Sequence, residues 1–126
     1  MGKDLYEQFN IARRTFTEAE EISGLPLIRL CFSGTEKELK LTEYTQPAIL
    51  TVSIAALRVF ESEFGLRPFC VAGHSLGEYS ALVSVGALAF SDAVGVVRER
   101  GRLMQEAVPS GKGSMAVILG LETQEV

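Results

Sequence analysis

The sequence has no tryptophan, one histidine, two cysteines and four prolines in 126 residues. Two cysteines are too few for the disulfide framework of a small secreted domain. Cys31 and Cys70 both lie in apolar stretches of the sequence. We therefore expect both to be reduced thiols in the core of a cytoplasmic protein.

Long apolar runs and an excess of positive charge are also missing. No stretch reaches the length of a membrane span, and the N-terminus lacks the basic and then apolar layout of a signal peptide. The net charge of −4 argues against nucleic acid and against an anionic membrane as partners. With 47% hydrophobic and 22% charged residues, the composition is that of an ordinary globular protein, either one domain or part of one.

The most informative stretch is a sharp turn between two apolar segments. The apolar run 69–72 leads into Gly-His-Ser-Leu-Gly at 73–77, and an amphipathic segment follows at once. This order predicts the strand, turn and helix of a nucleophile elbow, with Ser75 as the catalytic nucleophile and the Leu76 N–H as an oxyanion donor. Gly73 and Gly77 are expected to keep bulk away from the bend. The alternative is a tight turn with only a structural role.

Helical patterns cover most of the remaining chain: residues 3–23 in two pieces, 35–39, 45–64, 76–85 and 91–107. Thr35 and Glu38 form a predicted capping box for the helix at 35–39. Thr45 is expected to cap the long helix, with Ile49, Leu50, Phe60 and Phe64 on its buried face. Residues 27–32 fit either one buried helical turn or a strand.

Arg100 lies within the apolar stripe of the last predicted helix. Its neighbours on that face are Val97 and Met104. A buried guanidinium must be paired, because an unpaired buried charge costs several kcal/mol. The partner is either one of the sixteen carboxylates of the chain or the carboxylate of a substrate held by the arginine fork.

Three segments resemble one enzyme family: Gly-His-Ser-Leu-Gly-Glu-Tyr-Ser-Ala-Leu at 73–82, Thr-Gln-Pro-Ala at 45–48 and Arg-Gly-Arg-Leu-Met-Gln at 100–105. They are similar to the malonyl-CoA:acyl-carrier-protein transacylases and the acyltransferase domains of fatty acid and polyketide synthases. The resemblance implies an α/β fold. Residues 1–111 would belong to an α/β-hydrolase-like large subdomain, and 112–126 would begin a ferredoxin-like small subdomain with a strand at 114–121. The resemblance also favours a helix at 27–32. Gln46, although it lies in one of the three segments, is still interpreted as a plain helix-start residue.

The resemblance also implies a reaction. Ser75 would take a malonyl-type acyl group from coenzyme A and pass it to the phosphopantetheine thiol of an acyl carrier protein, and Arg100 would bind the free carboxylate. No cofactor beyond these substrates and no metal is expected. A non-catalytic carrier-docking piece and an α/β-hydrolase esterase or lipase are the rival hypotheses.

The catalytic base is the part that this chain lacks. The only histidine, His74, directly precedes Ser75, and adjacent side chains on an elbow diverge. We expect His74 to be partly buried and hydrogen-bonded under the turn. In the family the base lies beyond the stretch that corresponds to residue 126, and a glutamine loop of the oxyanion hole precedes residue 1. We therefore expect an internal fragment that is inactive alone and that associates with itself or with the rest of its parent enzyme.

Overall fold

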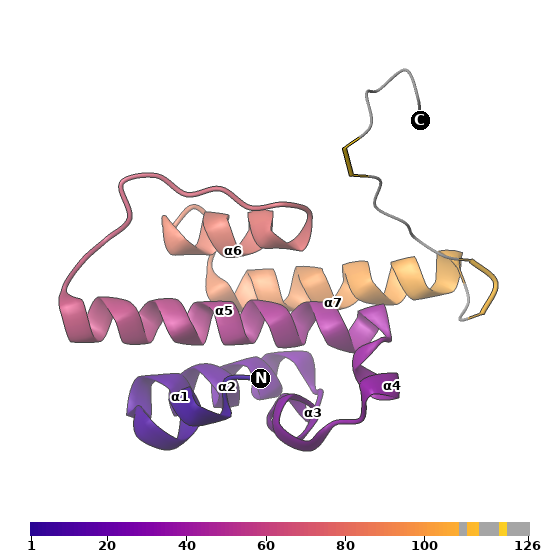
Figure 1. Cartoon of the computed structure of the whole chain (residues 1–126), viewed down its shortest axis with the longest axis horizontal. Coiled ribbons are helices and arrows are strands. Elements are labelled where there is room, and N and C mark those ends of the chain that lie inside the picture. Colours follow the sequence, from indigo (N-terminus) through magenta and orange to yellow (C-terminus); the bar gives the residue numbers. More distant parts are fainter. Residues whose placement is uncertain (109–110, 114–118, 121–126) are drawn as a thin grey trace.

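The computed structural model describes residues 1–108, 111–113 and 119–120. Within these ranges the chain forms helices only: α1 (Lys3–Gln8), α2 (Asn10–Ser23), α3 (Leu27–Ser33), α4 (Glu36–Leu39), α5 (Thr42–Phe64), α6 (Leu76–Ser84) and α7 (Phe90–Ala107). The long helix α5 runs through the middle, with α1, α2 and α3 on one side and α6 and α7 on the other (Figure 1). No helix in the described ranges is long and apolar enough to cross a membrane.

The N-terminal helices confirm the predictions from local patterns. The segment 3–23 forms two helices, and the Arg13 side chain donates to the carbonyls of Tyr6 at 2.8 Å and Glu7 at 2.6 Å, at the end of α1. Gly24 ends α2 in the left-handed conformation, with φ 64°. The segment after it is helical, as the family resemblance favoured, whereas the local pattern had left helix and strand open. Local signals are therefore sufficient for α1 and α2 but not for α3.

The predicted capping box of α4 is also present. The Thr35 hydroxyl accepts from the Glu38 N–H, and the Glu38 carboxylate accepts from the Thr35 N–H at 2.8 Å. Arg29 donates to the same carboxylate at 2.8 Å. Together these donors lower the pKa of Glu38 to about 2, with the Arg29 hydrogen bond as the largest cause.

The start of α5 differs from the prediction. The helix begins at Thr42, and the Thr45 hydroxyl donates back to the Leu41 carbonyl at 2.9 Å instead of capping. The reason is a contact distant in sequence: the Thr42 hydroxyl donates to the Gly101 carbonyl at 3.0 Å, and the Thr42 N–H donates to Gln105 Oε1 at 3.3 Å. Helix α7 therefore fixes the first turn of α5.

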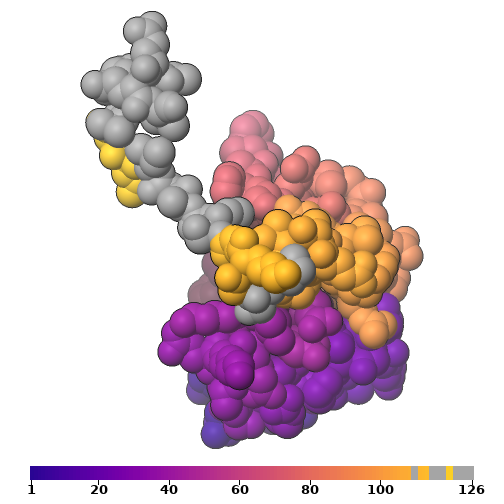
Figure 2. Space-filling view, turned by 90° about the vertical axis from the view of Figure 1, so that its right-hand side faces the viewer, coloured from indigo at the N-terminus to yellow at the C-terminus, as the bar shows by residue number. Residues whose placement is uncertain are grey.

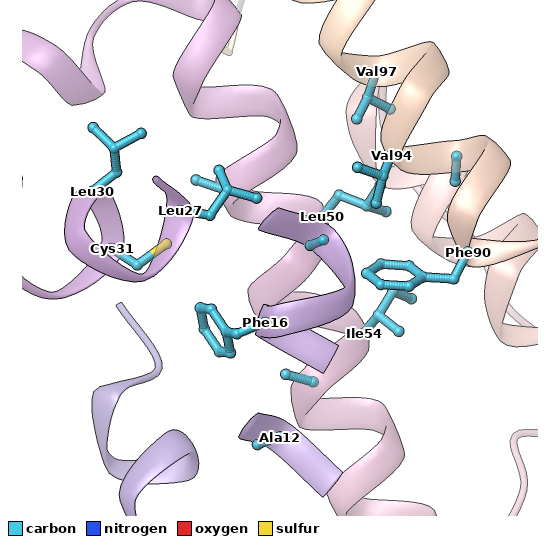
Figure 3. Packing of buried hydrophobic residues seen from close by; sticks show 14 of the residues in the cluster. Ala12, Phe16, Leu27, Leu30, Cys31, Leu50, Ile54, Phe90, Val94 and Val97 are labelled. Atoms are coloured by element: carbon cyan, nitrogen blue, oxygen red, sulfur yellow. The ribbon is translucent and has the colours of Figure 1, made fainter. Parts of the chain in front are cut away.

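The core lies where α2, α3 and α7 meet α5 (Figure 3). Phe16, Leu50, Ile54, Val94 and Val97 fill it. The buried face of α5 was only partly predicted, because Ile49, Phe60 and Phe64 are 40%, 44% and 67% exposed. Helix α5 is apolar around much of its circumference, so the pattern alone did not identify the side that faces α2 and α7.

The predicted strand at 69–72 is absent from the described structure. These residues belong to the exposed connection between α5 and α6 (Figure 1). A β-strand requires hydrogen bonds to a neighbouring strand, and the described residues supply no such neighbour. The predicted strand at 114–121 lies mostly outside the described residues, so the boundary between 1–111 and 112–126 remains a prediction.

The two cysteines also differ from each other. Cys31 is buried in the core, and burial raises the pKa of its thiol to about 11. Cys70 is exposed beside the turn, so the expectation of two core thiols is wrong for this residue. Its apolar neighbours in the sequence are themselves exposed, and they therefore form no core around it.

Gly101 allows α7 to approach the first turn of α5 closely. Figure 2 shows α7, in orange, directly over the purple and magenta surface of the first half of the chain. A Cβ atom at Gly101 would lie 2.5 Å from the Thr42 carbonyl oxygen. Gly95, on the same helix, would meet nothing within 4 Å. The contact between the helices therefore depends on glycine at 101 and not at 95.

We expect Gly101→Ala to lower the free energy of unfolding of the chain by about 1–3 kcal/mol, because one helix must move away from the other. Gly95→Ala is the matched control, since it adds the same methyl group to the same helix in open space. It should raise the free energy of unfolding by up to about 1 kcal/mol. Urea unfolding followed by circular dichroism measures both. Equal effects of the two substitutions would contradict the close approach.

Candidate active site

Ser75 lies at the tip of a sharp turn that enters α6. Its backbone has φ 53° and ψ −108°, and among the described residues it is the only non-glycine residue with positive φ. The Gly77 N–H donates to the His74 carbonyl at 2.9 Å, and the Glu78 N–H donates to the Ser75 carbonyl at 3.3 Å. Such strain persists only where the surrounding structure imposes it. The turn predicted from the sequence is therefore present, with the serine exposed on it.

The two glycines of the turn have different roles. A Cβ atom at Gly73 would overlap the backbone of Gly77 and Glu78, so this position requires glycine. A Cβ atom at Gly77 would meet nothing within 4 Å. The prediction that both glycines make room for the bend is confirmed for Gly73 only.

We expect Gly73→Ala to open the turn, because the added methyl group and the backbone of Gly77 cannot occupy the same space. The hydrogen bonds of the Gly77 and Glu78 amides would then weaken, and amide hydrogen exchange at these positions should become at least about tenfold faster. Gly77→Ala is the matched control and should leave exchange in the turn within about twofold. Unchanged exchange in Gly73→Ala would contradict this geometry.

Arg100 extends from α7 to the side chain of Ser75. Its Nη2 donates to Ser75 Oγ at 2.9 Å, and its Nη1 donates to Gln46 Oε1 at 2.6 Å. The guanidinium carbon lies 5.9 Å from the ring centre of Tyr79. Within the described part of the chain, Arg100 makes no ion pair with a carboxylate. The sequence left two possible partners for Arg100, a carboxylate of this chain or the carboxylate of a substrate. The first is not observed in the described residues.

Gln46 is the residue of this site that the sequence analysis missed. It is 5% exposed, and its Nε2 donates to Met104 Sδ at 3.1 Å while its Oε1 accepts from Arg100. The prediction treated it as a helix-start residue. The available signal was chemical: a long polar side chain beside the apolar residues Pro47 and Ala48 needs a partner, as does an arginine inside an apolar stripe.

The Leu76 N–H, the predicted oxyanion donor, directly follows Ser75 in the turn. It is the first amide of α6, and it donates to no backbone carbonyl in the described part of the chain. Amides at a helix start are unpaired and carry the positive end of the helix dipole. A negative charge developing next to Ser75 would therefore meet an available donor.

His74 differs from its prediction. The side chain is exposed instead of partly buried, and the described residues provide it with no hydrogen-bond partner, including Ser75 Oγ. Nothing in the described structure thus makes His74 the base of Ser75. Across the same residues, no group of three or more histidine, cysteine and acidic side chains is arranged to hold a metal ion.

Comparison with known proteins identifies the family. The profile of the acyl transferase domain family matches residues 1–125. The chain belongs to this family. Among curated proteins, one relative is the malonyl CoA-acyl carrier protein transacylase of Bacillus subtilis strain 168, to which this acyl transferase chain is 56% identical over 124 residues. The alignment covers 98% of the chain and 39% of that relative. The chain thus spans about two fifths of the length of the relative.

Solved structures agree with this assignment. FabD from Acinetobacter baumannii is 49% identical and superimposes with a TM-score of 0.89 over 99% of the acyl transferase chain and 39% of its own length. A malonyl-transacylase in complex with the acyl carrier protein of its type II polyketide synthase is 48% identical, with a TM-score of 0.81 over 88% of the chain and 36% of its own. The chain therefore has part of an acyltransferase fold.

Proposed function

We propose that this chain carries the nucleophile and the carboxylate-binding arginine of a malonyl-CoA:acyl carrier protein transacylase. The observation that carries the proposal is the 2.9 Å contact between Arg100 Nη2 and Ser75 Oγ. A guanidinium this close to a nucleophile matches an acyl group whose free carboxylate lies near its reacting carbonyl. Malonyl thioesters have this arrangement, and the relatives named above are transacylases of malonyl groups.

The first half of the reaction loads the serine. Ser75 Oγ attacks the thioester carbonyl and loses its proton to a base, and the negative charge on the carbonyl oxygen is stabilised by the Leu76 N–H. The C–S bond then breaks, coenzyme A leaves as a thiol after taking a proton, and a malonyl ester remains on Ser75. The proposed base lies outside these 126 residues, because the side chain of His74, the only histidine of the chain, is exposed and makes no hydrogen bond to Ser75 Oγ.

The second half returns the serine to its starting state. The phosphopantetheine thiol of an acyl carrier protein attacks the ester carbonyl, the ester C–O bond breaks, and Ser75 Oγ recovers a proton. Carrier protein and coenzyme A are thus the proposed partners, and no cofactor takes part in either step.

Arg100 has a second task in this cycle. In the present structure one of its amino groups donates to the Ser75 hydroxyl. A bound malonyl carboxylate would replace that hydroxyl as the acceptor and leave Oγ available for attack. Arg100 also lines a hollow on α7, together with Val96, Glu99, Leu103 and Met104.

The α/β architecture belongs to the same proposal. Phe64, Leu66 and Phe69 are 67%, 57% and 104% exposed in this chain. Exposed apolar side chains so close together in the sequence are typical of a surface that another part of a protein covers. We propose that further strands of the parent enzyme cover it and pair with 69–72, and that 112–126 begins the small subdomain.

The test uses the full-length protein that contains this chain. Incubation with radiolabelled malonyl-CoA should label Ser75, and addition of phosphopantetheinylated carrier protein should move the label to the carrier. Carrier protein without phosphopantetheine is the control and should stay unlabelled. Rapid release of free malonate without transfer would indicate an esterase, and the absence of any labelled serine would indicate a non-catalytic segment.

A further inference from the structure

A chain of three polar contacts links α5, α7 and the turn. Gln46 Nε2 donates to Met104 Sδ at 3.1 Å, Arg100 Nη1 donates to Gln46 Oε1 at 2.6 Å, and Arg100 Nη2 donates to Ser75 Oγ at 2.9 Å. The amide of Gln46 is thus fixed at both ends. Since Nη1 is occupied by Gln46, the other amino group of the guanidinium is the one that faces the nucleophile.

The backbone around Gln46 is also held in place. One turn before it, Thr42 is bonded to the Gly101 carbonyl and to the Gln105 side chain. The absence of a side chain at Gly101 lets the two helices approach closely at this level. Gln46 and Arg100 therefore extend from the same rigid junction, so the amide can determine the orientation of the arginine.

The amide is suited to this task because it is neutral. A glutamate at this position would pair with the guanidinium in a bidentate way and offset its charge before a substrate arrives. An apolar side chain would leave Nη1 without an acceptor and the long arginine side chain free to rotate. An amide oxygen orients the guanidinium and leaves its full positive charge for the substrate.

We propose that Gln46 is a positioning residue that sets the preference for acyl groups with a free carboxylate by orienting Arg100 without neutralising it. This inference rests on the proposed function and assigns Gln46 a role in the selectivity of that site. Gln46 acts on the substrate only through Arg100.

The test compares Gln46→Glu and Gln46→Met with a matched control, Gln105→Glu, in the full-length protein. Gln105 is a glutamine of α7 whose Oε1 accepts from Thr42, so the control makes the same chemical change at the same junction. The measured quantity is the ratio of kcat/KM for loading of malonyl-CoA to that for acetyl-CoA. Gln46→Glu should lower the ratio at least about 30-fold. Gln46→Met should lower it about 5-fold, mainly through the KM for malonyl-CoA, and Gln105→Glu should change it less than about twofold.

A second measurement does not depend on turnover. Free malonate should protect Ser75 of the unaltered protein from a fluorophosphonate probe, and this protection should be lost in Gln46→Glu and weakened in Gln46→Met. An equal loss of malonyl and acetyl loading, or an unchanged ratio with full protection, would overturn the inference and leave Gln46 as a packing residue. If Gln46→Glu does not fold, the ratio and the protection in Gln46→Met decide. An unaltered protein that loads neither thioester would contradict the proposed function, and this inference with it.

Discussion

Ser75→Ala is expected to abolish acyl-enzyme formation in the full-length protein while the fold stays intact. The serine is exposed at the tip of the turn, so the substitution removes one hydroxyl group and no core contact. Loss of a serine nucleophile in a hydrolytic triad reduces turnover by about 10⁶-fold, so we expect a loss of at least about 10⁴-fold here. Mass spectrometry of the peptide around position 75, after incubation with malonyl-CoA, measures the acylation directly.

Ser75→Gly separates the chemistry of this position from its backbone strain. It removes the nucleophile as alanine does, but glycine adopts φ 53° without a steric penalty. We therefore expect both variants to be inactive and only the glycine variant to unfold at a higher temperature than the parent. If Ser75→Ala yielded as much malonylated peptide as the parent protein, the acyl group would have to be on another residue, and the assignment of Ser75 would be refuted.

Much of the helical fold could be predicted from local patterns. The division of 3–23, the end of α2 at Gly24 and the capping box at Thr35 each depend on residues within one or two turns of each other. The start of α5 could not be predicted in this way, because it depends on Gly101 and Gln105 of a helix far along the chain. The segment 69–72 shows the same limit, since a strand requires neighbours that a local pattern does not contain.

The site was predicted less completely than the helices. Gly73 and Ser75 form a local motif whose geometry follows from their spacing, and the structure contains that turn. Arg100 was singled out because a charge inside an apolar stripe demands a partner, and the family resemblance then assigned a substrate carboxylate as that partner. Gln46 was missed because no local pattern joins it to an arginine of another helix. The exposure of His74 was mispredicted because burial depends on the segments that cover the turn.

Replacement of Arg100 should change the choice of substrate more than the capacity for acyl transfer. Removing one member of a desolvated charge pair costs about 2–5 kcal/mol, so Arg100→Ala should lower kcat/KM for malonyl-CoA by at least about 30-fold. Acetyl-CoA has no carboxylate to bind, and its loading should be unchanged or faster, because the substitution also removes the donor that occupies Ser75 Oγ. Steady-state loading assays with both thioesters in the full-length protein measure the two effects.

Two further variants show whether charge or geometry is responsible. Arg100→Lys keeps the positive charge but has a single nitrogen, which cannot bond to Gln46 and to a substrate carboxylate in the way that the guanidinium fork does. Its preference for malonyl should therefore fall between those of the parent and Arg100→Ala. Arg98→Ala removes an exposed arginine from the same helix and should leave the preference unchanged. If Arg100→Ala instead reduced malonyl and acetyl loading equally, Arg100 would serve only to hold α7 against α5 and the turn, and the free carboxylate would have to be recognised elsewhere.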